Sequence, residues 1–476
     1  MHPAADGLGE NRMRKGRHGP VYRMLAGAAG RKALRFHTPG HKGRIRLPFA
    51  AFDLTELPGT DALHEPSGAL LEAAAEAASC WRAGQSFLLV NGSTAGIQAM
   101  TLWAAMERRK IVLPRDCHVS AIYACAIAGM QPVWLDPVWS GADQLSRFSL
   151  DCLDRLPDSK FALFLTYPDY YGRCIGLDAV KTRLAGHDGV ILADSAHGAH
   201  FAFSDLLPPD AGSVADAWVT GAHKTLPAPT QTALLHVKDP GNGPAIARFL
   251  RSVTTTSPSF PLLAGLDDSR LLMQRSGSAL DSLVESCDNL AARLNRLPGL
   301  RCWREEDALS MGYGGFDPTR LVVDVRGLGL NGWQAGERLR ALGVEPELCD
   351  IYRVVLIATV MDDEPMLNQL VWAFEQLAAE RQDHPFFGGI AGVPARGEAV
   401  MTIREAWFSK AVQVPVEQAA GRIAAEPFGA YPPGIALCAP GEVITADAIA
   451  LARQAQALGG GLFGVRQGAL AVVAQS

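Results

Sequence analysis

The 476-residue sequence lacks the features that identify several large classes of protein. No apolar stretch reaches about 18 residues without a charged residue, so no transmembrane helix is expected. The net charge is −5, whereas a nucleic-acid-binding protein is expected to carry a basic patch. No internal repeat is visible. The sequence therefore predicts neither a membrane nor a nucleic acid as a partner.

The sequence also lacks a cysteine pattern. Its nine cysteines are scattered without a CxxC pair, and an odd number with irregular spacing favours reduced thiols over disulfides or a zinc site. Residues 1–18 are polar and basic and have no apolar core, so they are not a secretory signal; we expect a disordered tail there. These features favour a cytoplasmic protein.

What is present is the composition of an ordinary globular protein, with 48% hydrophobic and 20% charged residues. Short apolar runs alternate with helical patterns from about residue 85 to residue 240, which predicts an α/β fold with a mainly parallel, doubly wound sheet. A long amphipathic helical stretch follows, and short strands and helices recur beyond residue 299. The predicted organisation has four parts: an N-terminal tail and arm (1–45), a large domain (46–285), a small α/β domain (286–385) and a C-terminal domain (386–476).

One lysine stands out between two apolar runs in the segment 214–236, VADAWVTGAHKTLPAPTQTALLH. The pattern predicts strand, loop and strand, with Lys224 at the turn. Burying an ammonium group is costly unless it is paired or neutral, and a desolvated lysine can act as a nucleophile or form a Schiff base. The alternative is an exposed loop lysine, which is the commoner situation.

An aspartate upstream favours the reactive lysine. The run VILA predicts a buried parallel strand that ends at Asp194, and ligands of open α/β sheets bind at the carboxyl ends of the strands. A lysine that holds a cofactor and a carboxylate that keeps a pyridine nitrogen protonated are what a pyridoxal phosphate enzyme needs. Asp194 could instead cap a helix.

A candidate phosphate site precedes both residues. The strand FLLV runs into Asn91-Gly92-Ser93-Thr94 and then into a helix, so free N–H groups, the helix dipole and two hydroxyl groups would face an anion. The same residues could be a plain helix cap, and the Walker pattern of nucleotide-binding loops is missing.

Two further loops follow predicted strands at the same edge of the sheet. His118 lies in one of them and could stack on a flat cofactor ring, although a lone histidine is more often structural. The other is Thr166–Gly172, TYPDYYG. Asp194, His197 and His200 have a metal-like spacing, but the run follows a strand, so helical geometry cannot be assumed and no metal is expected.

Taken together, these motifs resemble the ornithine/lysine/arginine decarboxylase family of pyridoxal phosphate enzymes, in its short form without an N-terminal receiver-like domain. The resemblance extends from about residue 19 to the C-terminus. It is carried by these stretches: FHTPGHKG, FDLTELPGTDALHEPSG, FLLVNGSTAGIQA, LPRDCHVSA, VILADSAHGAHF, AHKTLPAPTQTALLH, TTSPSF and YPPGIALCAPGE.

The resemblance implies a fold like that of aspartate aminotransferase. Such a fold has a large domain around a mostly parallel seven-stranded sheet, smaller C-terminal α/β domains, and a homodimer with active sites at the subunit interface. The implied reaction is α-decarboxylation of a basic amino acid (arginine, lysine or ornithine) to the amine and CO2, with pyridoxal 5′-phosphate as the cofactor.

The resemblance also implies roles for individual residues. Lys224 would bind the cofactor as an imine and Asp194 would pair with its pyridinium nitrogen. His118 would stack on one face of the ring, Ala196 would pack on the other, and His197 would lie near the phenolic oxygen or the substrate carboxylate. The phosphate would be held by Ser93, Thr94 and His223. Glu442 and Asp61 are candidates for the acid that binds the basic side chain of the substrate.

Two positions depart from the family pattern. Ser195 stands where the family usually has glutamate, and Gly221 stands where it usually has a serine that contacts the phosphate. These departures motivate an alternative, a pyridoxal phosphate enzyme on the same scaffold that carries out aminotransfer, elimination or C–C bond formation. A non-catalytic relative is disfavoured because Asp194, Lys224 and His118 are intact.

Overall fold

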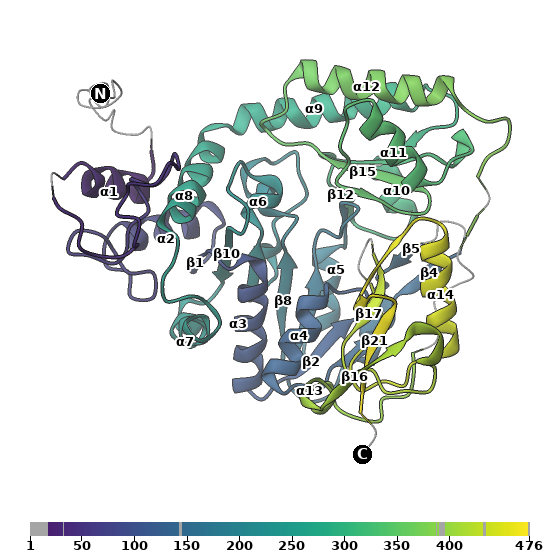
Figure 1. Cartoon of the computed structure of the whole chain (residues 1–476), viewed down its shortest axis with the longest axis horizontal. Helices are drawn as coiled ribbons and strands as arrows, with labels where there is room; N and C mark the ends of the chain where they lie inside the picture. Colours follow the sequence, from purple (N-terminus) through teal and green to yellow (C-terminus); the bar gives the residue numbers. More distant parts are fainter. Residues whose placement is uncertain are drawn as a thin grey trace.

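The computed structural model describes residues 18–31, 33–141, 145–386, 388–389, 396–431 and 435–474 (Figure 1). The tail expected over residues 1–18 lies outside the described residues except for His18. The chain then begins with α1 (Pro20–Ala29), which packs against α8 (Phe260–Arg275) and α2 (Ala69–Cys80). The helical pattern of the sequence continues to residue 34 (VYRMLAGAAGRKAL, 21–34), but α1 ends at Ala29, before the basic residues.

The large domain is built on a seven-stranded sheet with the strand order β1-β10-β9-β8-β6-β2-β3. All pairs from β3 to β9 are parallel, and only β10 runs against its two neighbours. The mostly parallel seven-stranded sheet is therefore confirmed. Its strands, in chain order, are β1 (Gln85–Leu89), β2 (Lys110–Pro114), β3 (Val133–Leu135), β6 (Phe161–Thr166), β8 (Gly189–Ser195), β9 (Ala217–Thr220) and β10 (Ala233–Val237).

Helices cover both faces of this sheet, which explains why its strands are continuously apolar. Successive residues of a strand point to opposite faces, so Ile111 and Leu113 of β2 belong to one core and Val112 belongs to the other. The face that carries Ile111 and Leu113 is covered by α3 (Gly92–Met106), α4 (Val119–Ala128) and α7 (Gly243–Val253). The opposite face is covered by α2, α8 and α5 (Leu177–Leu184).

The second sheet is antiparallel and has the order β11-β13-β15-β14. A helical stretch links it to the large domain, as the sequence suggested, but as two helices, because α8 ends at Arg275 and α9 (Gly277–Leu294) follows (Figure 1). The other elements of this part are β11 (Arg301–Cys302), α10 (Glu305–Ser310), β13 (Arg320–Asp324), α11 (Gly332–Ala341), β14 (Leu348–Cys349), β15 (Arg353–Ile357) and α12 (Glu364–Ala379). We propose residues 286–385 as a small domain. The break between α8 and α9, at Ser276, lies ten residues before this boundary.

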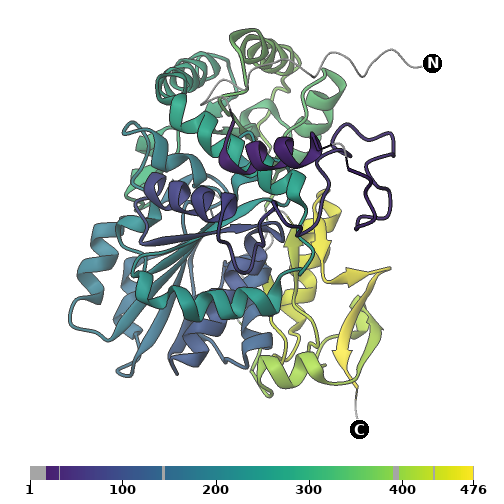
Figure 2. The same cartoon turned by 90° about the vertical axis from the view of Figure 1, so that its left-hand side faces the viewer.

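The C-terminal part consists of two three-stranded sheets with the orders β16-β21-β20 and β18-β17-β19. Figure 2 shows these elements in yellow-green beside the large sheet. α13 (Ile403–Phe408) packs on α4, and Ile403 joins the core of the large domain. The remaining elements are β16 (Ala411–Pro415), β17 (Phe428–Tyr431), β18 (Ile435–Cys438), α14 (Ala446–Ala457), β19 (Gly461–Phe463), β20 (Val465–Arg466) and β21 (Ala469–Val473).

Short elements complete the fold. β4 (Val138–Ser140) pairs with β5 (Leu145–Arg147), and β7 (Arg173–Cys174) pairs with β12 (Gly315–Phe316), which links the large and small parts. Lys224 lies on a single-turn helix, α6 (Ala222–Thr225), rather than in an irregular loop. In the part of the chain that the structure describes, every helix is too short or too polar to cross a lipid bilayer.

Candidate active site

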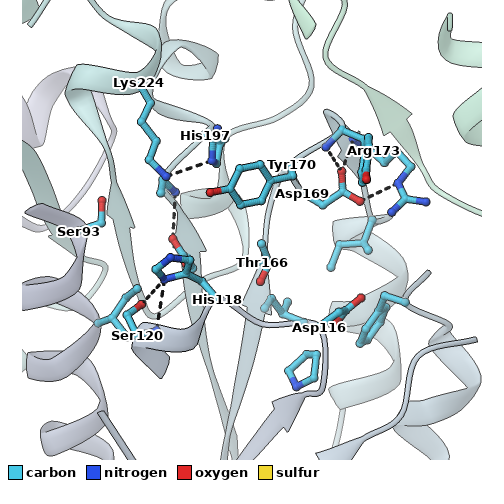
Figure 3. Close-up of a pocket in the computed structure, with 18 of the residues that line it drawn as sticks. Ser93, Asp116, His118, Ser120, Thr166, Asp169, Tyr170, Arg173, His197 and Lys224 are labelled. Atoms are coloured by element: carbon cyan, nitrogen blue, oxygen red, sulfur yellow. Dashed lines mark hydrogen bonds and ion pairs between the residues drawn. The ribbon is translucent and has the colours of Figure 1, made fainter. Parts of the chain in front are cut away.

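A cavity of about 280 Å³ opens at the carboxyl edge of the large sheet (Figure 3). Five segments that follow β1, β2, β6, β8 and β9 supply most of its polar residues, because parallel strands end at one edge. Its polar and charged lining is Ser93, Thr94, Asp116, His118, Ser120, Ser146, Thr166, Asp169, Tyr170, Tyr171, Arg173, Asp194, His197, His223, Lys224 and Tyr313. The structure thus brings together the predicted lysine, aspartate, histidines and hydroxyl groups.

Lys224 projects from α6 into this cavity. Its Nζ lies 3.0 Å from Nε2 of His197 and 5.8 Å from the ring centre of Tyr170. Burial lowers the pKa of Lys224; Asp194 opposes this effect and the charge of Arg320 adds to it. The lysine is therefore inside the protein, as the reactive interpretation requires, and a larger fraction of it is the free amine at neutral pH.

His197 is 4% exposed and lies between two cationic side chains. Its Nδ1 is 3.2 Å from Nη2 of Arg320, and its ring packs against Tyr170 with the ring centres 4.6 Å apart. Burial holds the pKa of His197 well below its usual value, and the charges of Lys224 and Arg320 lower it further. The imidazole is therefore neutral at physiological pH.

Asp194 lies at the carboxyl end of β8, just before its last residue Ser195, and is 5% exposed. One carboxylate oxygen accepts a hydrogen bond from the N–H of Ala196 at 3.2 Å, and the side chain lines the cavity. Asp194 does not cap a helix, because the short helix that follows (Ala199–Phe203) has Gly198 as its N-cap. A buried carboxylate in this position supplies a fixed negative charge at the floor of the site.

His118 lies where β2 passes into α4. Its Nδ1 is 2.7 Å from Oγ of Ser120 and accepts the Ser120 N–H, so His118 is the N-cap of α4 while its ring remains accessible from the cavity. Burial lowers the pKa of His118, Asp194 opposes this, and Lys224 lowers it further. A neutral, fixed ring with an open face is suited to stacking on a flat ligand.

The start of α3 forms an anion cradle. The side chain of the N-cap residue Asn91 accepts from the N–H of Thr255 at 3.3 Å instead of capping its own helix. Oγ of Ser93 is buried without a hydrogen-bond partner among the described residues, and Thr94 is exposed in the cavity. His223 contacts the carbonyl of Thr232 through Nδ1 at 2.9 Å, which leaves Nε2 for a ligand. Unused donors beside a helix N-terminus suit a phosphate.

Both departures from the family pattern have local physical explanations. A Cβ atom at Gly221 would lie 2.7 Å from the carbonyl oxygen of Ala196 and 3.2 Å from Oγ of Ser93, so a serine would force these atoms apart. Ser195 is fully buried and is not part of the cavity wall, because it points to the opposite face of β8 from Asp194.

The two acids expected to bind the substrate side chain lie elsewhere. Glu442 forms a buried, two-pronged ion pair with Arg115, at 2.6 and 2.9 Å, which ties the C-terminal part to the large domain. Asp61 accepts the N–H groups of Ser67, Gly68 and Leu70 at the start of α2. It therefore caps α2. Neither acid lines the cavity in this chain.

Sequence reasoning missed several residues of the site. Arg320 reaches His197 from β13, 123 residues away in the sequence, and no motif announces it. Asp169 and Arg173 pair at 2.7 Å within the TYPDYYGR segment. Asp116 lies beside them; burial raises its pKa, the charge of Arg173 lowers it, and that of Asp169 raises it. A polar loop that follows a buried strand indicates that residues of the site lie in it, but it does not indicate which of them form ion pairs.

The third residue of the metal-like spacing is held apart from the cavity. Nε2 of His200 lies 3.3 Å from an oxygen of Asp317 and 3.2 Å from the Thr319 hydroxyl. Within the described ranges, no group of three or more His, Cys, Asp or Glu side chains is arranged to hold a metal ion.

Two family models match the chain. The model described as "Orn/Lys/Arg decarboxylase, major domain" matches residues 19–365, and "Orn/Lys/Arg decarboxylase, C-terminal domain" matches residues 395–459. The arginine decarboxylase of Bacillus subtilis (strain 168) is 31% identical over 451 residues, which cover 90% of this chain and 92% of that protein.

Solved structures show the same fold. The constitutive lysine decarboxylase of E. coli superposes with a TM-score of 0.79 at 18% identity and covers 96% of this chain and 82% of its own. The serine palmitoyltransferase of Sphingomonas wittichii superposes with a TM-score of 0.52 at 16% identity and covers 64% of this chain and 75% of its own. The first match includes the C-terminal part, whereas the second covers only about two thirds of the chain.

Proposed function

The chain belongs to the Orn/Lys/Arg decarboxylase family of pyridoxal phosphate-dependent carbon–carbon lyases, and from this premise we propose that it decarboxylates arginine through the cavity that contains Lys224. As a member of this family, the chain is a decarboxylase of a basic amino acid that uses pyridoxal phosphate as its cofactor. The choice of arginine and the roles of the residues are our proposals.

The observation that supports these roles best is the position of Lys224. Its amine lies inside the cavity that His118 and Ser93 also line (Figure 3), and Asp194 belongs to the same lining. The cofactor fits this set of groups, because its phosphate needs the unused donors of the cradle, its ring needs an open stacking face, and its aldehyde needs an amine.

When bound, pyridoxal phosphate supplies an aldehyde for covalent attachment and a ring that accepts the electron pair released at the α-carbon of the substrate. We assign attachment to Lys224 and stacking to His118. The carboxylate of Asp194 would keep a proton on the ring nitrogen, and Ala196 would pack on the opposite side of the ring from His118. Ser93, Thr94 and His223 would hold the phosphate. His197 orients Lys224 through the 3.0 Å contact.

The charge of the cavity favours a cationic substrate. Three acidic side chains line it (Asp116, Asp169 and Asp194), against the guanidinium group of Arg173 and the amine of Lys224. The acidic side chains outnumber the guanidinium group, so the field favours entry of a basic side chain. The relative named arginine decarboxylase, aligned over 90% of the chain, supports arginine over lysine and ornithine.

The alternative of aminotransfer, elimination or C–C bond formation loses its support in the geometry. It was motivated by Ser195 and Gly221, and these residues act locally: the first faces away from the cavity and the second relieves a steric contact. Neither changes the groups beside Lys224.

We also propose that the active form is a homodimer. Large apolar side chains of the N-terminal arm and of the residues just after it are exposed in the single chain, with Phe36 at 90%, Leu34 at 80% and Phe49 at 45%. Exposed apolar side chains along one segment fit contact with a second copy. Analytical ultracentrifugation should give twice the 50.8 kDa of one chain, and a single-chain mass would contradict the dimer.

The test of the function is release of labelled CO2 from arginine, lysine and ornithine, each labelled at the carboxyl carbon. We expect arginine to give the highest kcat/KM, with agmatine formed in equal amount to CO2. Release from lysine alone would overturn the choice of substrate. A cofactor-loaded protein that releases CO2 from none of the three would overturn the proposed function.

A further inference from the structure

A buried chain of contacts runs from Arg320 through His197 to Lys224. Nη2 of Arg320 lies 3.2 Å from Nδ1 of His197, and Nε2 of the same ring lies 3.0 Å from Nζ of Lys224. A guanidinium group has only donors and stays charged in proteins. Nδ1 of His197 must therefore be the acceptor of this contact.

The acceptor role of Nδ1 fixes the other side of the ring. A neutral imidazole has one N–H and one bare nitrogen, so an acceptor at Nδ1 places the proton on Nε2. That N–H points at Nζ of Lys224. An ammonium group offers only donors, and two donors 3.0 Å apart would repel, whereas a free amine has a lone pair to accept the bond.

From this arrangement we propose that Arg320 is a positioning residue that acts through His197 to hold Lys224 as a free amine, ready to react with an aldehyde. The proposal deepens the proposed function, because it rests on Lys224 as the site of cofactor attachment. Lys224 and His197 line the cavity, whereas Arg320 does not.

The packing around Arg320 indicates that its position is fixed. Arg320 is 1% exposed, and its Nε and Nη1 are buried without hydrogen-bond partners among the described residues. Its own contacts therefore do not offset the free-energy cost of removing the guanidinium group from water. Its stem lies against Gly172, where a Cβ atom would be only 2.7 Å from Cβ of Arg320, and the nearby Tyr170 ring packs on His197.

The other charged and titratable groups near Lys224 act in both directions. Asp194 on β8 and Glu347, just before β14, raise the pKa of Lys224, while burial and the charge of Arg320 lower it, and the net shift is downward. His118 and Tyr170 face the amine from the other walls. The lowered pKa of Lys224 agrees with the assignment of its amine as the acceptor of the Nε2–H of His197.

The first test measures Lys224 in the full-length protein after its cofactor has been removed with hydroxylamine. Competitive acetylation, followed by mass spectrometry of the Lys224 peptide, gives the labelling rate against pH. We expect R320M and H197F to raise the apparent pKa of Lys224, so that labelling at pH 7.5 falls by about tenfold, as it does when the pKa of an amine rises by about one. R320K, which keeps a charged donor, should label more like the wild type.

The two variants separate the hydrogen-bond chain from simple charge repulsion. H197F removes the ring nitrogens and keeps the charge of Arg320. If only that charge mattered, R320M alone would slow labelling, and unchanged labelling in H197F would overturn the proposal.

The second test reads the wild-type protein itself. With histidine-selective 15N labelling of the cofactor-free wild type, the His197 resonances should show a bare Nδ1 and a protonated Nε2 at pH 7.5; the resonances missing from the H197F spectrum assign them. A proton on Nδ1 would contradict the proposal. Neither test uses substrate, so failure of arginine turnover would leave both results interpretable.

Discussion

Two buried histidines of the large domain have similar burial and opposite surroundings. His236 on β10 lies between Trp81 and Trp218, with ring centres 5.0 Å away on each side, and its nitrogens contact the hydroxyls of Ser86 at 2.8 Å and Thr220 at 3.1 Å. His197 instead contacts the guanidinium group of Arg320 and the amine of Lys224, and it opens on the cavity.

The difference between the two sites lies in what their partners can do. A hydroxyl can donate or accept, so both nitrogens of His236 are satisfied in either neutral tautomer and the cluster has no chemistry left over. Around His197 only one tautomer is allowed, and its N–H is directed at an amine. A buried histidine is thus structural where its partners are neutral and adaptable, and functional where they are charged and fixed.

The largest expected effect comes from removing the amine of the reactive cluster. Lys224→Ala should lower kcat with arginine by about 10³-fold or more, because the covalent anchor and the group exchanged with substrate are lost together. The thermal unfolding midpoint of the cofactor-free protein should change little. Turnover within tenfold of the wild type would contradict the assignment of Lys224.

A buried ion pair outside the cavity should behave like the His236 cluster. Glu442→Ala leaves Arg115 charged and unpaired at 5% exposure of its side chain, which should cost about 3–5 kcal/mol of stability. Urea denaturation measures the loss. The KM for arginine should stay within about twofold once the protein is folded; a large rise in KM with normal stability would restore Glu442 as a substrate ligand.

His236→Phe tests the structural histidine directly. The ring stacking between the tryptophans is kept, but the hydroxyls of Ser86 and Thr220 lose their partner, which should cost about 1–3 kcal/mol of unfolding free energy. The kcat per folded enzyme should equal that of the wild type, since His236 is remote from the cavity lining. A fall in kcat without loss of stability would remove the distinction between the two histidines.

The same variant makes a prediction about pH. Burial lowers the pKa of His236 from 6.5 to about 3, so below pH 6.5 the unfolded chain takes up a proton that the folded protein does not. The wild type should therefore lose stability as the pH falls from 6.5 toward 3, and His236→Phe should lose less. Parallel stability curves for both proteins across this range would contradict the low pKa.

The smallest effect is expected at the cap of α2. Asp61→Ala removes the acceptor of four backbone N–H groups, three of them at the start of α2, and should cost about 1 kcal/mol, as lost helix caps do. Asp61→Asn should recover part of this loss, because an amide oxygen can still accept. Equal stability of wild type and Asp61→Ala in urea denaturation would show that the cap is unimportant.

The sequence predicted the part of this site that follows strands. Asp194, His118 and Ser93 each come within four residues of the end of an apolar run, and parallel strands end at one edge, so their convergence on Lys224 could be predicted without coordinates. Arg320 could not be predicted in this way, because it reaches His197 from another domain across 123 residues and its own strand gives no sign of a buried charge.

The two misplaced acids show the limit of motif reasoning. Glu442 and Asp61 lie in stretches that resemble the family, and the need for an acid near a basic substrate made them candidates. Their partners, Arg115 and the first turn of α2, become apparent only when the C-terminal part and the segment before α2 are placed in space. A carboxylate with every oxygen already bonded is a structural group, whichever motif contains it.

Borohydride reduction of the purified protein loaded with pyridoxal phosphate, followed by peptide mass spectrometry, tests the central claim most directly. We expect one modified residue, Lys224, with modification complete at one cofactor per chain and the visible absorbance abolished in Lys224→Ala. Stable attachment to a different lysine in a protein that releases CO2 from arginine would contradict the assignment.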